Sequence, residues 1–367
     1  MAVERDSGVA SQWWRQLPER ASHRFGHHTS RVGHHASKYD VYRFGDGILK
    51  VGGSEQALLD YLGQLYADCR IDERGDESLP TVRCVVSPTC HEHVARVEFE
   101  DPEPLDSFDF VTAVYAGRGY RECFRTAGGW RCLTHGDDPA TPALALRGSV
   151  ALVDRRRTWY PLIAHLLVNR LLQFQRKMLF FHAASLRIGG AGVLLFGDKC
   201  AGKTTTALFL AARGHGLLSD EVGAVRSADN TLTPYRRALS IRPGPLPELV
   251  RAQLRSGEFR RETLGDGTTR IRARIGSIFR TPPAATTPLK RMFFLDGFAR
   301  TARAQRVAPG TLHLRHLQPF GCSVYGASKR NVVFQLATML SRTQAYALTL
   351  GSPDSTAALI EGITENA

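Results

Sequence analysis

The stretch GVLLFGDKCAGKTTTALFL, residues 192–210, decides the fold class. An apolar run leads into a glycine-rich turn and then into a segment with helical composition. This is the strand, loop and helix context in which the pattern G-x-x-x-x-G-K-[ST] binds phosphate. Glycines let successive backbone N–H groups turn toward phosphate oxygens, and the helix N-terminus adds the positive end of its dipole. The stretch therefore predicts an α/β domain that binds a nucleoside triphosphate.

The residues of this loop have separate expected roles. We expect nine consecutive residues to contact the nucleotide: Gly197, Asp198, Lys199, Cys200, Ala201, Gly202, Lys203, Thr204 and Thr205. Lys203 would meet the β- and γ-phosphates, and the Thr204 hydroxyl would ligate Mg²⁺. P-loops serve ATPases, switches, transporters and kinases alike, so the flanking residues must decide among them. The sequence contains neither the NKxD motif of GTPase switches nor the LSGGQ motif of transporter cassettes.

An acidic pair follows the loop after one helix. The segment RGHGLLSDEV, residues 213–222, contains a glycine to end the helix, a short strand, and then Asp220 and Glu221. Ligands of open parallel sheets sit at the carboxyl ends of the strands. An acidic pair there can coordinate Mg²⁺ and accept the proton of an attacking hydroxyl, whereas the bland alternative is a solvent-facing turn. Upstream, His182 lies in the apolar run MLFFHAASLRIGG, where it either belongs to the core or faces the phosphates.

These segments together resemble the catalytic domain of the HPr kinase/phosphorylase family. In that family an apolar strand with a His precedes the P-loop, and the pattern R-G-H-x-L-x-x-D-D follows it. This chain has FFHAAS, GDKCAGKTT and RGHGLLSDEV in the same order. The resemblance is strongest over residues 179–226 and continues through YRRALSIRP, PLKRMFFLDGF and NVVFQLATMLSRTQAYALTL, so that it covers half of the chain. The implied fold class is α/β, a P-loop HPr-kinase-like C-terminal domain with a small α+β N-terminal domain.

The resemblance implies a serine kinase that uses ATP and Mg²⁺. Carried over residue by residue, it implies that Lys203 and Thr204 hold phosphate and metal. Asp220 would be the catalytic base and a metal ligand, with Glu221 as its acidic neighbour. His182 would be a partner at the phosphate end of the site.

The chain departs from the family pattern in two ways. Glu221 stands where the family usually has Asp, and no E-x-R-G-x-G segment is present. We therefore do not expect reversal by inorganic phosphate, or HPr as the acceptor. Divergent relatives of this kind resemble stand-alone kinases of ribosomally made peptide pathways, so the expected acceptor is a Ser or Thr hydroxyl of a protein or precursor peptide. A small-molecule kinase on the same scaffold, and a nucleotide-binding regulatory protein without transfer activity, remain open.

The sequence predicts three parts. Residues 1–37 are polar and without a sustained period, and we expect a flexible arm there. Residues 38–156 read as a small α+β module: YDVYRFGDGILKVGG predicts two strands around a Gly-Asp-Gly turn, a helix follows, and TVRCVVS, HVARVEFE, FDFVTAVYAG and YRECFRTAGGWRCLT are strand-like. Residues 157–367 form the P-loop catalytic domain, entered through a helix over 158–177. Mobile loops are expected within 241–306, which is rich in Arg, Gly and Pro.

Histidines elsewhere carry only weak metal signals. The pairs His27–His28 and His34–His35 lie in the predicted arm, and the segment CHEHV, residues 90–94, follows a predicted strand. The two pairs lack a helix or strand to hold them, whereas His91 and His93 would lie on one face of a strand and, with Cys90, could bind a transition metal. Surface histidines are the preferred interpretation.

Charge and cysteine content limit the partners and the compartment. A formal net charge of +13 favours an acidic partner, with coding bias toward arginine as the alternative. Nucleic acid is not expected, because the arginines lack the interleaved aromatics of a stacking platform. Arg236, Arg237 and Arg242 either neutralise transferring phosphoryl charge or form a basic solvated edge. Seven cysteines without a secretion signal indicate reduced thiols in a cytoplasm, and no membrane crossing is expected; a homo-oligomer remains open.

Overall fold

The computed structural model describes residues 40–53, 56–71, 81–86, 94–100, 110–115, 120–126, 129–135, 142–147, 150–153, 168, 171–172, 175, 177–257, 259–263, 269–279, 285–308, 315–317 and 329–366. The predicted arm, the histidines of residues 90–93 and most of the predicted helix over 158–177 lie outside these residues. The chain divides into two compact units. The first is Met1–Val41, Leu49–Leu59 and Thr81–Leu166; the second is Tyr42–Ile48, Asp60–Pro80 and Leu167–Ala367. Each unit is described by itself, and the predicted domain boundaries stay predictions.

The strands of the first unit belong to a nine-stranded sheet of order β1-β2-β3-β4-β9-β8-β5-β6-β7. Its strands are β1 (Asp40–Phe44), β2 (Gly47–Gly53), β3 (Thr81–Val86), β4 (Val94–Glu100), β5 (Phe110–Tyr115), β6 (Tyr120–Thr126), β7 (Gly129–His135), β8 (Pro142–Arg147) and β9 (Val150–Val153). The pairs from β3 to β7 are antiparallel. The strands predicted from the sequence, including the two around the Gly-Asp-Gly turn, are confirmed. Helix α3 (Gln56–Tyr66) follows β2 and continues into the second unit.

The second unit contains an eight-stranded mixed sheet, and one of its strands leads into the glycine-rich loop over residues 197–202. Its strands are β10 (Met178–Ile188), β11 (Ala191–Phe196), β12 (Gly216–Ser219), β13 (Val222–Arg226), β14 (Thr231–Thr233), β18 (Thr287–Phe298), β19 (Arg303–Val307) and β20 (Gln344–Leu350). The order is β11-β10-β13-β14-β18-β20-β19, with β12 on β10 and a further pairing of β11 with β18. The pairs β11–β18 and β18–β20 are parallel. The predicted α/β class is confirmed at this level.

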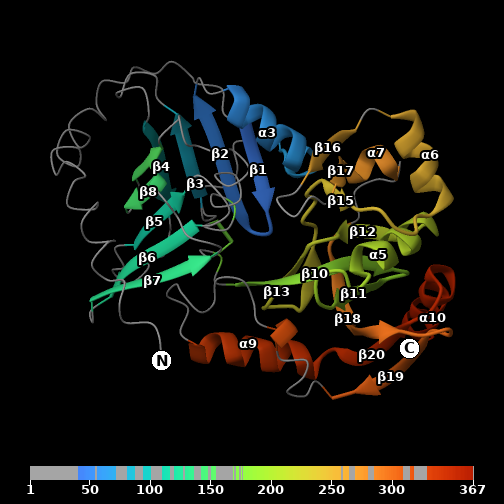
Figure 1. Ribbon diagram of the computed structural model, residues 1–367. Coiled ribbons are helices and arrows are strands. Elements are labelled where there is room, and N and C mark those ends of the chain that lie inside the picture. The colour runs from blue at the N-terminus through green and yellow to red at the C-terminus, as the bar shows by residue number, and fades with distance from the viewer. Residues whose placement is uncertain are drawn as a thin grey trace. The chain divides into compact units, whose positions relative to one another are not determined.

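Strand β11 is apolar along its length because both of its faces are covered. Successive side chains of β11 alternate between two cores: Val193 and Leu195 enter one, and Leu194 and Phe196 enter the other. The first core also holds the apolar sides of α5 (Lys203–Ala212) and α10 (Pro353–Glu365). Figure 1 shows these two helices beside the sheet. The second core contains Phe294, whose ring stacks on that of Phe196 at 5.0 Å.

The motif RGH, residues 213–215, lies at the C-terminal end of α5. Gly214 has a φ of +98°, and the backbone N–H groups of Gly214 and His215 donate to the carbonyls of Ala211 and Leu210. This is the Schellman arrangement that ends helices at glycine, so the predicted glycine stop is confirmed. The side chains of Arg213 and His215 both bind the carboxylate of Glu361 on α10, at 2.6 to 2.7 Å. Two of the three motif residues thus tie α5 to α10.

Much of the arginine-rich region 241–306 is regular structure. It contains α6 (Glu248–Ser256), β16 (Arg260–Thr263), β17 (Thr269–Ala273), α7 (Ile275–Ile278), β18 and most of β19. Strands β16 and β17 join β15 (Leu239–Ile241) in a three-stranded antiparallel sheet of order β15-β17-β16. The expectation of mobile loops is therefore wrong for these segments. Apolar residues such as Ile241, Val250 and Ile275 pack in the first core. The high arginine content of the region makes this apolar pattern hard to recognise in the sequence.

The remaining elements complete the second unit. They are the short helical turns η1 (Ala67–Cys69) and η2 (Arg315–Leu317), and helix α9 (Lys329–Ser341). Among the described residues, no helix combines the length and the apolar character that crossing a bilayer requires.

Candidate active site

The glycine-rich loop lies between strand β11 and helix α5, in the predicted order of strand, turn and helix. Strand β11 ends at Phe196, the loop covers residues 197–202, and α5 begins at Lys203. Gly202 has a φ of +96°, which residues with a Cβ rarely adopt, and a Cβ added there would lie 2.8 Å from Cδ1 of Leu350. Cys200 also has a left-handed φ, of 68°. The loop thus depends on a glycine immediately before the helix that would hold the phosphates.

Lys203 is folded back onto its own loop. Its ammonium donates to the carbonyl oxygens of Gly197, at 2.6 Å, and Asp198, at 3.0 Å. The residue is only 7% exposed. Burial lowers the pKa of Lys203, while Asp198 and Glu221 act to raise it. The Lys203 charge is therefore held within the loop, and Glu221 lies close enough to influence it.

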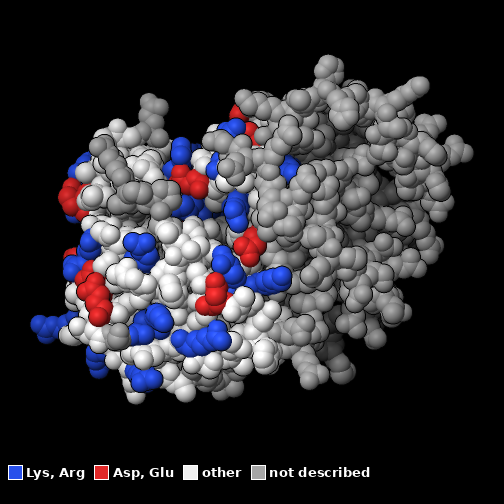
Figure 2. Space-filling view, turned by 180° about the vertical axis from the view of Figure 1, so that it is seen from behind, with Lys and Arg blue, Asp and Glu red and all other residues white. Residues whose placement is uncertain are grey.

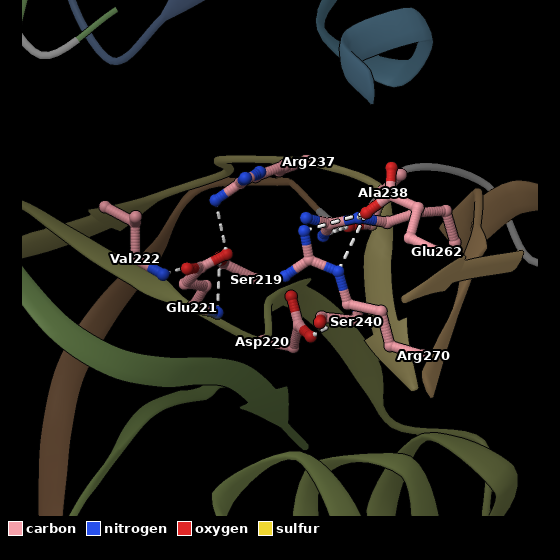
Figure 3. A network of polar contacts seen from close by, with 10 residues as sticks. Ser219, Asp220, Glu221, Val222, Arg237, Ala238, Ser240, Glu262 and Arg270 are labelled. Carbon is pink, nitrogen blue, oxygen red and sulfur yellow. Dashed lines mark hydrogen bonds and ion pairs between the residues drawn. The ribbon is translucent and has the colours of Figure 1, made fainter. Parts of the chain in front are cut away.

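A serine positions the acidic pair. Strand β12 ends at Ser219, whose hydroxyl oxygen accepts hydrogen bonds from the backbone N–H groups of Glu221, at 3.2 Å, and Val222, at 3.0 Å (Figure 3). Such serine turns fix the chain direction just after a strand. The two carboxylates therefore leave the strand end in a defined local geometry, as the sequence predicted for the end of this strand.

Asp220 is a buried carboxylate with one satisfied oxygen. It is 4% exposed, and Oδ2 accepts a hydrogen bond from the Ser240 backbone N–H at 3.2 Å (Figure 3). Oδ1 is buried without a hydrogen-bond partner. Burial, together with the neighbouring charge of Glu221, raises the pKa of Asp220 to about 6. A base with a pKa near the working pH is effective in proton transfer, and the solvent-facing alternative is excluded for this residue.

Glu221 is more accessible than Asp220 and has an arginine partner. Its Oε2 accepts a hydrogen bond from Arg237 Nη1 at 2.5 Å, and its side chain is 36% exposed (Figure 3). His182, an exposed residue of β10, has its cross-strand partner Val222 directly after Glu221. Partial burial of the ring and the charge of Lys203 lower the pKa of His182, while Glu221 raises it. The structure thus brings His182, Lys203 and Glu221 into one electrostatic neighbourhood.

The three arginines after the acidic pair have different environments. Arg236 is 6% exposed and Arg237 is bound to Glu221, so a solvated basic edge is excluded for both. Arg242 Nη1 lies 3.4 Å from Cys200 Sγ and so touches the loop. Strand β15 connects these features, because Ser240 holds Asp220 and Arg242 follows the strand. A continuous set of contacts therefore joins the loop to the acidic pair.

The donor set suits Mg²⁺. Thr204 offers a hydroxyl and the acidic pair offers carboxylates, the hard oxygen ligands that Mg²⁺ prefers together with nucleotide phosphates and water. Asp220 Oδ1, buried and without a partner, is an oxygen whose burial a cation would offset. The described residues contain no group of three or more His, Cys, Asp or Glu side chains that could hold a metal alone.

Basic side chains are scattered on the face drawn in Figure 2. Lys and Arg are spread over the described part of this face, with Asp and Glu beside several of them. The positive charge there does not form a continuous stripe.

Comparisons with known proteins give a short local match. A stretch of 51 residues is 39% identical to HPr kinase/phosphorylase of Clostridium botulinum (strain Eklund 17B / Type B), and equally to that of strain Alaska E43 / Type E3. The match covers 14% of this chain and 17% of each relative. The Hpr(Ser) kinase/phosphatase of Coxiella burnetii aligns over 51% of this chain and 88% of its own at 15% identity, but a TM-score of 0.25 is too low to establish a shared fold. No model of a protein family matches. The 51-residue match indicates a distant HPr-kinase-like relationship.

Some residues of the site were not identified from the sequence. Ser219 and Ser240 hold the acidic pair, and Arg272 lies across from Ser240 in the β15–β17 pair. Ser219, directly before the acidic pair, is a local signal that could have been read. Ser240 and Arg272 act through long-range strand pairing, which leaves no local pattern.

Proposed function

We propose that this protein is an ATP- and Mg²⁺-dependent kinase that transfers the γ-phosphoryl group to a Ser or Thr hydroxyl of a protein or peptide. The observation that carries the proposal is the pairing of a P-loop with a buried acid of raised pKa. Asp220 has a pKa of about 6, and strand β15 links it by contact to the loop. The distant relationship to HPr kinase/phosphorylase supports the same reaction class.

The loop would bind the phosphates through its backbone N–H groups and Lys203. On nucleotide binding, the Lys203 ammonium exchanges the carbonyls of Gly197 and Asp198 for the β- and γ-phosphate oxygens. Thr204 and Asp220 are the proposed Mg²⁺ ligands. When bound, Mg²⁺ neutralises the charge that develops between the β- and γ-phosphates.

Asp220 is the proposed base. The acceptor hydroxyl oxygen forms a bond to the γ-phosphorus as the bond from that phosphorus to the ADP oxygen breaks. The hydroxyl proton passes to the Asp220 carboxylate, and a phosphoester and ADP result. Glu221 is held by Arg237, and its negative charge favours the protonated form of Lys203, which would contact the transferring group.

A peptide acceptor is proposed over a small molecule, and a ribosomally made precursor peptide is the proposed kind. A pocket described below is lined by three arginines, and its charge favours an acidic peptide as the acceptor. The HPr-kinase-like arrangement of the domain is part of the same proposal.

Incubation with γ-labelled ATP, Mg²⁺ and a mixture of Ser-containing peptides tests the proposal. We expect label in phosphoserine with the native chain and none with Lys203→Ala. Label that appears only as inorganic phosphate would establish an ATPase instead. ATP binding without any movement of label would establish a nucleotide-binding regulatory protein.

A further inference from the structure

A pocket lies apart from the phosphate loop within the second unit. It has a volume of about 930 Å³. Its lining residues come from the end of α3, the end of α6, strands β16 and β17, and α7 with the residue before it: Tyr61, Gln64, Leu65, Gln253, Ser256, Gly257, Phe259, Arg260, Glu262, Arg272, Arg274 and Ser277. We call it the arginine pocket.

The arginine pocket has more positive than negative charge. One carboxylate, Glu262, serves three guanidinium groups: Arg270 at 2.7 Å, Arg272 at 3.1 Å and Arg260 at 3.6 Å. Arg274 has Asp68 as its partner at 2.9 Å. The charged residues of the pocket lining itself are Arg260, Arg272 and Arg274 against Glu262, which leaves two positive charges in excess. A guanidinium has five N–H donors and the shared carboxylate cannot satisfy three such groups, so the cluster is matched to an added anion.

Arg272 has a buried N–H group without a hydrogen-bond acceptor. Its side chain is 6% exposed, and Nη2 is buried without a hydrogen-bond partner. Burial, with the neighbouring charges of Arg237 and Arg270, lowers the pKa of this residue. Burying a charged group without enough partners is costly, and an anion in the pocket offsets that cost.

Arg260 presents its charge to the pocket opening. Its side chain is 48% exposed, lies over the ring of Tyr61 at 5.4 Å from the centroid, and donates to Gln64 Oε1 at 2.7 Å. Stacking on an aromatic ring and one hydrogen bond hold the guanidinium in place while leaving donors free. This is the arrangement that pre-orders an arginine for a carboxylate.

The back wall of the pocket adjoins the candidate base. Arg272 on β17 is the cross-strand partner of Ser240 on β15, and Ser240 donates to Asp220. Ser240 therefore contacts both the strand of the lining residue Arg272 and the candidate base.

We infer that the arginine pocket binds acidic side chains of the phosphoryl acceptor, so that an acidic peptide is held beside the strand that contacts Asp220. This rests on the proposed kinase function. It goes beyond it by naming the acceptor as an acidic peptide and by assigning a docking site to it.

The test is a binding measurement without nucleotide. The probe is a fluorescein-labelled peptide Asp-Glu-Asp-Glu-Gly-Ser-Gly with an amidated C-terminus, and the comparison peptide is Asn-Gln-Asn-Gln-Gly-Ser-Gly. We expect the acidic peptide to bind at least tenfold more tightly than its amide counterpart. Arg260→Gln should weaken binding of the acidic peptide about 5- to 20-fold, since charge-assisted hydrogen bonds are lost.

Arg255→Gln is the matched control. Arg255 is an exposed arginine of α6 outside the pocket lining, paired with Glu248, so the variant loses the same charge without touching the pocket. Its affinity for the acidic peptide should stay within twofold of the native value. Equal weakening by the two variants would show a general charge effect and overturn the inference.

The remaining outcomes are equally decisive. No binding of the acidic peptide, or equal binding of both peptides, overturns the inference. So does displacement by MgATP, which would assign the pocket to the nucleotide, or preferential displacement by a single-stranded oligonucleotide. Because peptide binding is first measured without ATP, absence of that binding leaves the kinase proposal intact. Failure of phosphoryl transfer with peptide binding preserved would instead overturn the kinase proposal.

Discussion

The backbone N–H of Ser240 holds Oδ2 of Asp220 at 3.2 Å, while the other oxygen of the same carboxylate is buried without a partner. One hydrogen bond offsets only part of the cost of burying an ionised carboxylate. The fold therefore keeps Asp220 in a state that accepts a proton near pH 6. The predictions below follow from this carboxylate, from the phosphate loop and from the charges around them.

The first prediction concerns stability and pH. The folded pKa of Asp220, about 6, is above its ordinary value of 3.8, so between these values the folded state binds more protons than the unfolded state. Stability therefore decreases as pH rises through this window. Relative to Asp220→Asn, the native chain should lose about 2 to 3 kcal/mol of unfolding free energy between pH 4 and pH 7. Urea unfolding at several pH values measures this difference.

Asp229→Asn is the control for that experiment. Asp229 lies at the turn after β13, and its side chain is 49% exposed. Its stability difference from the native chain should change by less than about 0.5 kcal/mol across the same pH range. The stability difference between Asp220→Asn and the native chain could prove as independent of pH as that of Asp229→Asn. The buried carboxylate would then not have a raised pKa.

The second prediction concerns the glycine before α5. Gly202→Ala places a Cβ at a φ of +96°, and Gly214→Ala does the same at +98°. Both should lower the unfolding free energy by about 1 to 2 kcal/mol, because a left-handed φ is strained for alanine. Leu350 Cδ1, the atom nearest the added Cβ at Gly202, belongs to a side chain that can shift.

Nucleotide affinity separates the two glycine variants. Gly202→Ala should weaken MgATP binding at least tenfold, whereas Gly214→Ala should leave it unchanged, since Gly214 lies at the other end of α5. Calorimetric titration with MgATP provides the measurement. Equal affinity of the two variants would contradict phosphate binding at this loop.

The third prediction concerns Lys203. Lys203→Met keeps the length of the side chain and removes the ammonium that binds the carbonyls of Gly197 and Asp198. MgATP affinity should fall at least tenfold, since the charge that meets the phosphates is lost. Lys199→Met, which changes an exposed lysine of the same loop, is the comparison and should have a smaller effect. The prediction fails if Lys199→Met reduces affinity as much as Lys203→Met.

The fourth prediction tests whether His182, Lys203 and Glu221 share one neighbourhood. The pKa of His182 is lowered by burial and by Lys203, and raised by Glu221. Removing the Lys203 charge with Lys203→Met should therefore raise the His182 pKa, and Glu221→Gln should lower it further. NMR titration of the imidazole ring measures both shifts. Shifts of the same sign in the two variants would contradict the arrangement.

Local sequence predicted the parts of the site that local structure builds. The phosphate loop follows from glycines and a lysine at fixed spacing, and the position of Asp220 and Glu221 follows from the short apolar strand before them. The alternation of β11 side chains between two cores is visible in its unbroken apolar run.

What the sequence did not reveal depends on segments far apart in the chain. Arg260 meets Gln64 across 196 residues, and Glu361 binds Arg213 across 148 residues. A count of charges could not show that Arg272 is buried behind Ser240, or that Glu262 serves three arginines. The sequence therefore suggested mobile basic loops where the structure has a small sheet and the arginine pocket.

The rate of phosphoryl transfer from γ-labelled ATP to the acidic Ser peptide, compared between the native chain and Asp220→Asn, tests the central claim most directly. We predict that Asp220→Asn transfers the phosphoryl group about 1,000-fold more slowly than the native chain at pH 7, because the amide cannot accept the hydroxyl proton. Transfer by Asp220→Asn at the native rate would contradict Asp220 as the base.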